Sequence, residues 1–182
     1  MEKESIEYYV IRECEVVYKS FKRLKKSPDC GSSKEVYSVF KKDLMKMGVE
    51  VFIAVFMTGT NNIKAVYRNS EGGITSTYVS VNKVLKTGHM VEASSMILLH
   101  NHPSGNIEPS ENDKRITELF VNAGRLMEIK VIDHIIVGEN KYFSFADSGL
   151  IKRYESSRMS IAEIVNEAIT ERLNLKKNEG KS

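Results

Sequence analysis

A nearly continuous apolar run, from Val49 to Met57, most constrains how this chain can fold. Most of its residues are β-branched or aromatic, which favours an extended strand. An apolar run without alternation is typical of a strand that is covered on both faces. Glu50 is the one charged residue in this run, and it lies at the start. The sequence therefore predicts a buried strand that begins beside a carboxylate.

Strands and helices are predicted to alternate along the rest of the chain. Helices are expected after the capping residues Ser33, Ser80, Ser110 and Ser160, with Gly48 ending the first and Gly88 interrupting the second. The last helix, with a capping box from Ser160 and Glu163, is amphipathic and is expected either to dock on the domain or to pair with another chain. Further strands are expected at residues 63–68, 75–79, 95–99 and, as a hairpin, 130–137 and 141–145.

Composition excludes several classes of protein. The 182 residues are 41% hydrophobic, which predicts one domain with short extensions. The 27 basic and 24 acidic residues give a net charge of +3, too small for a general polyanion binder. No run approaches the ~20 apolar residues of a membrane span, and the polar start is unlike a secretory signal. Together with two cysteines that lack metal-binding or redox spacing, these features predict a cytoplasmic protein.

The first 33 residues are predicted to form an N-terminal extension. Residues 6–20 suggest an extended edge element, and Lys19 to Lys26 holds five basic residues. This basic cluster is either a solvated loop or a weak nucleic-acid contact.

Two histidines, His100 and His102, follow the apolar run 96–99. Because side chains alternate along a strand, both can point the same way while Asn101 points elsewhere. Pro103 and Gly105 then turn the chain sharply toward the helix capped by Ser110. Asp113 falls at the third position of that helix, where its side chain leans back toward the histidines. Two imidazoles and a carboxylate predict a zinc site whose fourth position is open to water.

Such a site needs a proton acceptor, and Glu50 is the candidate. Burying an unpaired charge at the start of a strand is costly, so packing does not explain why a glutamate is present there. The alternative is that Glu50 is a solvated carboxylate at the strand edge. The Ser110 hydroxyl either caps its helix or stabilises an oxyanion. His134 is expected to be satisfied within the core or to support a ligand, and His89 to lie on the surface.

These residues resemble the JAMM pattern of the MPN/JAB superfamily: His-x-His, then seven residues, then Ser-x-x-Asp. The closer resemblance is to the RadC family of bacteria, over about residues 34–151. It is carried by L-L-H-N-H-P-S-G from Leu98, E-P-S-E-N-D from Glu108, V-I-D-H-I-I-V-G from Val131 and Y-F-S-F-A-D-S-G-L from Tyr142. The strand E-V-F-I-A-V-F from Glu50 resembles the one that carries the superfamily's catalytic glutamate.

The resemblance implies an α/β fold of the JAB/MPN (cytidine deaminase-like) type, with a curved mixed sheet flanked by helices. It implies that His100, His102 and Asp113 bind a single zinc ion, that Glu50 is the acid/base, and that Ser110 stabilises the tetrahedral intermediate. The implied activity is that of a zinc metallopeptidase acting on a peptide or isopeptide-linked protein. The alternatives are a DNA-repair-associated accessory protein acting on or near nucleic acid, and a pseudo-enzyme that only binds partners.

Three segments are predicted: an extension at 1–33, a RadC-like JAB/MPN domain at 34–151, and a C-terminal amphipathic helix with a polar tail at 152–182. The extension does not resemble the helix-hairpin-helix segment of long RadC proteins, which weakens the case for DNA binding. The chain also departs from the family at Met57-Thr58-Gly59 and Ser80-Val81-Asn82. Because these positions are expected at the rim of the cleft, they bear on substrate choice.

Overall fold

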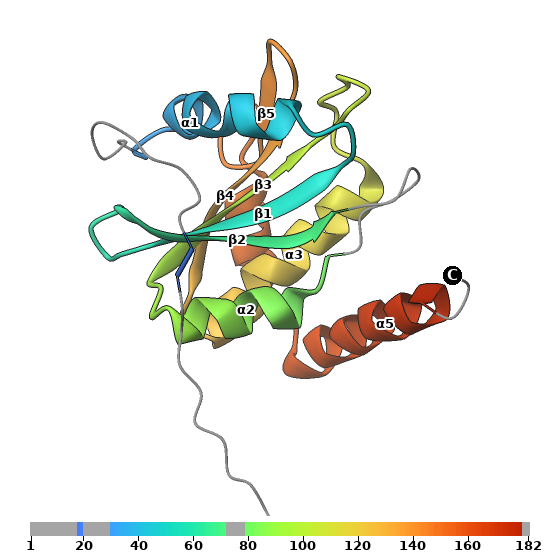
Figure 1. The fold of residues 1–182 in the computed structure, drawn as a ribbon. Coiled ribbons are helices and arrows are strands. Elements are labelled where there is room, and N and C mark those ends of the chain that lie inside the picture. Colours follow the sequence, from blue (N-terminus) through green and yellow to red (C-terminus); the bar gives the residue numbers. More distant parts are fainter. Residues whose placement is uncertain (1–17, 20–29, 72–78, 180–182) are drawn as a thin grey trace, which may run out of the picture.

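A computed structural model of the chain describes residues 18–19, 30–71 and 79–179 as a sheet flanked by helices (Figure 1). The five strands lie in the order β2-β1-β3-β4-β5. Their bounds are β1 Val51–Met57, β2 Ile63–Glu71, β3 Ser95–Asn101, β4 Lys130–Val137 and β5 Tyr142–Ser144. The helices are α1 Ser33–Met45, α2 Val81–Met90, α3 Glu111–Leu126, α4 Leu150–Ser157 and α5 Ile161–Glu179.

The sheet is mixed. β1 pairs antiparallel with β2 and with β3, β3 pairs parallel with β4, and β4 pairs antiparallel with β5. The predicted α/β architecture, a mixed sheet flanked by helices, is confirmed. β1 is buried along its whole length, as expected for a central strand with helices on both faces.

Each face of the sheet has its own core. On one face, α1 packs through Val36, Phe40 and Leu44 on alternate residues of β1 and β3. On the other face, α2 and α3 pack on the remaining residues, and Phe120 of α3 stacks on Phe52 at a centroid distance of 5.9 Å. Adjacent residues of one strand therefore belong to different layers, which decides where each polar side chain near the site can point.

Two details of the predicted helices were wrong. Ser32, not Ser33, caps α1, because the Ser33 hydroxyl donates instead to Asp147 at 2.5 Å. Gly88 does not interrupt α2. A Cβ at Gly88 would lie 2.8 Å from Ile129 Cδ1 and 3.0 Å from a ring atom of Phe56, so glycine lets the helix lie close to the core. The short helix α4 was not predicted, although its buried residues Ile151 and Tyr154 recur at helical spacing.

The C-terminal helix α5 docks on α3 by a narrow contact and extends away from the sheet (Figure 1). The predicted capping box of Ser160 and Glu163 is present. Ile164 is buried against the core, and Glu167 accepts a hydrogen bond from Arg115 at 2.7 Å. The side of α5 turned away from the core exposes Ile161, Val165 and Ile169.

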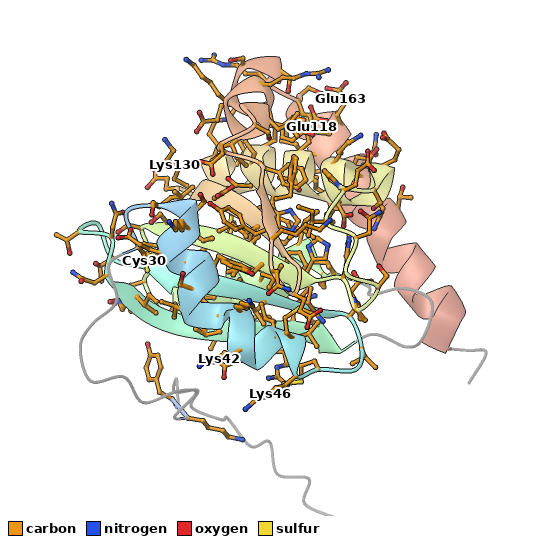
Figure 2. The ribbon with its side chains drawn as sticks, turned by 90° about the horizontal axis from the view of Figure 1, so that it is seen from above. Cys30, Lys42, Lys46, Glu118, Lys130 and Glu163 are labelled. Atoms are coloured by element: carbon orange, nitrogen blue, oxygen red, sulfur yellow. The ribbon has the colours of Figure 1, made fainter. Side chains whose placement is uncertain are left out.

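Some predicted features lie almost entirely outside the described residues. These are the edge element at 6–20, the basic cluster from Lys19 to Lys26 and the strand at 75–79. Within the described part, Lys42 of α1 and Lys46, which follows the end of that helix, are exposed (Figure 2). Among the described helices, none combines the length and the apolar composition that crossing a bilayer requires.

Candidate metal centre

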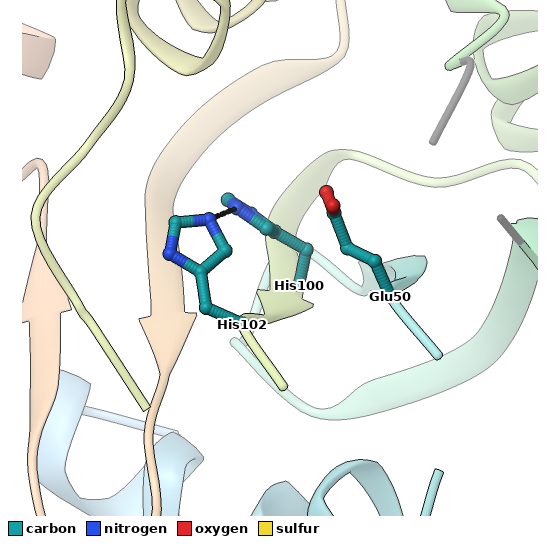
Figure 3. A group of neighbouring side chains, drawn as sticks. All are labelled: Glu50, His100 and His102. Atoms are coloured by element: carbon teal, nitrogen blue, oxygen red, sulfur yellow. Dashed lines mark hydrogen bonds between the residues drawn. The ribbon is translucent and has the colours of Figure 1, made fainter. Parts of the chain in front are cut away.

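The end of β3 brings the two predicted histidine ligands together. His100 is 1% exposed and lies on the α3 face of the sheet, with its ring 6.1 Å from the ring of Phe52. His102 follows the strand and is partly exposed. The two Nε2 atoms are 2.8 Å apart, so both rings present the same nitrogen to one point (Figure 3). The structure thus confirms that these side chains point the same way.

Asp113 reaches this point from the first turn of α3. Its carboxylate lies 3.3 Å from His100 Nε2 through Oδ1 and 3.7 Å from His102 Nε2 through Oδ2. A capping box fixes it: Asp113 Oδ2 accepts hydrogen bonds from the Ser110 backbone N–H at 2.8 Å and from the Ser110 hydroxyl at 2.6 Å. The hydroxyl of Ser110 is therefore engaged with Asp113 in this structure. Its predicted role toward an oxyanion stays a prediction.

Glu50 approaches the same point from the residue before β1. Glu50, His100 and His102 each place one possible ligand atom within 4.8 Å of the other two (Figure 3). Burial of the carboxyl raises the pKa of Glu50; nearby His102 opposes this shift and Asp113 adds to it. Glu50 is half-buried at the site, not a solvated residue at a distant strand edge.

The hydrogen-bond partner of His102 determines which of its nitrogens carries the proton. Its Nδ1 lies 2.6 Å from the backbone oxygen of Asn106. A carbonyl oxygen only accepts, so Nδ1 must be the donor. In the neutral ring the proton is then on Nδ1, and Nε2 presents a lone pair toward His100.

A chain of three buried groups determines the proton position on His100. The Thr117 hydroxyl donates to the backbone oxygen of Asp113, so it must accept from His134 Nδ1, which is 2.6 Å away. His134 Nε2 is then an acceptor, and His100 Nδ1, 2.8 Å from it, must be the donor. Burial lowers the pKa of His100 to about 4 and that of His134 well below its usual value, so both rings are neutral near pH 7. His100 Nε2 is consequently unprotonated.

If the His102 ring is neutral, two unprotonated nitrogens face each other at 2.8 Å, which is repulsive unless a cation lies between them. A proton or a metal ion would relieve this repulsion. The carboxylates of Asp113 and Glu50 beside the same nitrogens form a donor set of imidazole and carboxylate groups, which suits a divalent metal such as zinc. The residues present fit a metal centre, with His100 and His102 as ligands and a carboxylate from Asp113 or Glu50 as the third.

Thr117→Val should weaken metal binding although Thr117 touches no ligand atom of the metal. Without the hydroxyl, His134 Nδ1–H loses its acceptor, which favours the tautomer protonated on Nε2. That tautomer would donate to His100 Nδ1 and move the proton of His100 onto Nε2, where a metal must bind. Losses of supporting contacts of this kind typically reduce metal affinity about 10- to 100-fold. Competition with a chromophoric chelator measures the affinity.

Thr87→Val is the matched control, because the Thr87 hydroxyl donates to the backbone oxygen of Lys83 on α2, far from the site along the chain. An unchanged affinity in Thr117→Val would show that the chain from Thr117 to His100 does not set the tautomer.

Sequence reasoning found the four groups that converge but missed two residues that hold them. Thr117 was not singled out, and Asn101 was noted only as pointing away. His134 was expected in the core or in support of a ligand; the structure shows it buried and hydrogen-bonded to His100. His89 is exposed, as predicted.

The mixed sheet, with histidines and carboxylates together at a strand end, is consistent with a JAB domain that has a candidate metal site. A family model described as "RadC-like JAB domain" matches residues 30–150, and the chain belongs to the RadC family. Membership in this family and the Glu/His/His cluster are together consistent with a metal-dependent hydrolase.

Relatives with the printed name UPF0758 protein match about two thirds of the chain. The chain is 38% identical to one from Flavobacterium johnsoniae over 119 residues, covering 65% of this chain and 52% of the relative. It is 42% identical to one from Salinibacter ruber over 117 residues, covering 64% and 49%. A Methanosarcina mazei relative is 35% identical over 121 residues, covering 66% and 53%. The matched region spans about half the length of these relatives.

Proposed function

We propose that this protein is a zinc-dependent hydrolase that cleaves amide bonds, as a peptidase or an isopeptidase. His100, His102 and Asp113 hold the zinc ion in this proposal. Zinc bound by these residues would supply Lewis acidity and would lower the pKa of a water molecule toward neutrality. The substrate is a peptide or a protein joined through an isopeptide bond.

The observation that carries the proposal is the 2.8 Å distance between the Nε2 atoms of His100 and His102, with the carboxylates of Asp113 and Glu50 beside them. In neutral rings with these tautomers, neither nitrogen can donate a hydrogen bond to the other. Thr117, His134 and Asn106 direct both lone pairs to one point, which is costly unless the point holds a cation. A metal centre accounts for the whole arrangement.

Glu50 is the proposed proton carrier. Its carboxylate would accept a proton as water adds to the amide carbonyl carbon, and would deliver that proton to the departing nitrogen. A carboxylate with a raised pKa accepts a proton more readily, so the partial burial of Glu50 suits this role. Ser110, at the N-terminus of α3, is proposed to stabilise the oxyanion. For this its hydroxyl must turn from Asp113 toward the substrate.

Hydrolysis in heavy-oxygen water tests the proposed reaction. Zinc-loaded protein is incubated with a mixture of linear peptides and of peptides joined to lysine side chains, and the products are weighed by mass spectrometry. The proposal predicts products whose new carboxyl groups carry one heavy oxygen atom, and their loss on chelation and in Glu50→Gln. Product yields that survive chelation, or an absence of cleavage in both substrate classes, would contradict the assignment.

A further inference from the structure

We propose that Asn101 positions the carboxylate of Glu50 at the metal centre by clamping the backbone on both sides of Glu50. Asn101 lies between the two histidine ligands in sequence, yet its side chain reaches the start of the neighbouring strand. The proposal deepens the proposed function, since it rests on Glu50 acting at the metal site. It gives one short segment two tasks: the histidines bind the metal, and the residue between them places the proton carrier.

The clamp consists of two hydrogen bonds. The backbone N–H of Val51 donates to Asn101 Oδ1 at 2.8 Å, and Asn101 Nδ2 donates to the backbone oxygen of Val49 at 3.1 Å. Both bonds cross from β3 to the start of β1. The side-chain amide of Asn101 here bonds to backbone groups of the neighbouring strand, in place of a backbone-to-backbone bond between the strands.

The position of Asn101 follows from strand geometry. Phe52 is paired with His100, and both side chains lie on the α3 face of the sheet. The next residue, Asn101, must point to the opposite face, where Val51 also points. His102 then returns to the metal. The alternation that brings the two imidazoles together therefore also directs the intervening amide toward β1.

Two bonds at these atoms restrict the whole backbone of Glu50. The oxygen of Val49 belongs to the peptide unit before the Glu50 Cα, and the N–H of Val51 belongs to the unit after it. Rotation about φ or ψ of Glu50 would turn one unit relative to the other and break one of the two bonds. Asn101 of β3 thereby fixes the direction of the Glu50 Cα–Cβ bond. This direction determines where the side chain of Glu50 starts toward the metal centre.

Burial makes the clamp hard to replace. Asn101 and Val51 are both 0% exposed, so water has little access to the groups that they would leave unpaired. The side chain must donate through one atom and accept through another, and an amide does both. Leucine has nearly the same shape and neither group, and serine is too short to span both partners.

Asn122 provides a matched control for a purely structural role. It is 1% exposed, its Nδ2 donates to the backbone oxygen of Glu118 at 3.0 Å, and its Oδ1 accepts from the backbone N–H of Met159 at 3.0 Å. Like Asn101, it therefore donates one hydrogen bond to a backbone oxygen and accepts one from a backbone N–H, and the second bond joins α3 to the connection between α4 and α5. Loss of stability alone should affect Asn101→Leu and Asn122→Leu alike, whereas loss of positioning should affect only the first.

The experiment follows the side chain of Glu50 with Co2+ as the probe. In protein loaded with Co2+, the paramagnetic ion broadens the NMR signals of nearby groups, and this broadening falls steeply with distance. Asn101→Leu should weaken the broadening of the Glu50 side-chain signals and speed hydrogen exchange at the Val51 amide, while His102 signals stay broadened. Asn122→Leu should leave all three unchanged. If Asn101→Leu does not fold, Asn101→Ser carries the same test.

Unchanged Glu50 broadening in the folded Asn101 variant, or equal changes in Asn122→Leu, would overturn the proposal. With an amide substrate in hand, Asn101→Leu should lower kcat by up to about 100-fold at unchanged KM and metal affinity, as expected for a misplaced catalytic group. The Co2+ and exchange measurements need no substrate. They therefore test whether Asn101 positions Glu50 independently of activity. Full turnover in Glu50→Gln would contradict the proposed function but not the positioning by Asn101.

Discussion

Replacing Glu50 with glutamine is expected to lower kcat for amide hydrolysis by about 100- to 10,000-fold, the usual contribution of a general acid or base. Glutamine keeps the shape of the side chain and its place before β1, but it cannot accept a proton. The metal should remain bound, because His100, His102 and Asp113 are unchanged. Steady-state kinetics and metal analysis of the same protein sample measure the two effects separately.

Glu139→Gln is a control for this measurement, because Glu139 is exposed in the β4–β5 hairpin and should have no effect on kcat. Full activity in Glu50→Gln would remove Glu50 from the reaction. Loss of the metal in Glu50→Gln would show instead that Glu50 is a ligand, which the position of its carboxylate within 4.8 Å of a nitrogen of each histidine also permits.

Replacing His100 with alanine is expected to reduce metal affinity by more than about 100-fold, beyond the effect typical of a supporting residue. The ring supplies one of the two proposed nitrogen ligands. His134, whose ring nitrogen contacts His100, is not free to replace it, because the other nitrogen of His134 is bound to Thr117. Competition with a chelator of known affinity measures the loss, and circular dichroism shows whether the fold is retained.

His89→Ala is the matched control, since His89 is exposed at the end of α2. Asp113→Asn should also weaken binding strongly, whereas Glu50→Gln should not. This contrast identifies which carboxylate is the third ligand. Near-normal affinity in His100→Ala would mean that the metal, if present, binds elsewhere.

Local patterns in the sequence predicted most of the fold. The unbroken apolar run marked β1, and serine caps marked α2, α3 and α5. These features depend on neighbours within a few residues, which a sequence displays directly. The ends of elements were less predictable: β3 continues through Asn101 because its backbone still pairs with Val137 of β4, a partner far along the chain.

In the site too, features set by neighbours in the sequence were predictable, and features set by distant partners were not. Spacing was enough to bring His100, His102 and Asp113 together, because a strand end, a turn and a capped helix link them locally. The clamp from Asn101 to Val49 and Val51 depends on the register between β1 and β3, and a shift by one residue would point Asn101 to the other face. The contact from Thr117 to His134 depends on how α3 packs on β4. Such contacts follow from the assembled fold.

Metal content of the purified protein tests the central claim most directly. Elemental analysis of protein purified without chelators, and again after reconstitution with zinc and removal of the excess, should give about one zinc ion per chain. The His100→Ala variant treated in the same way should give almost none. A wild-type protein that retains no metal after reconstitution would contradict the account, because the opposed nitrogens of His100 and His102 would then have to share a proton.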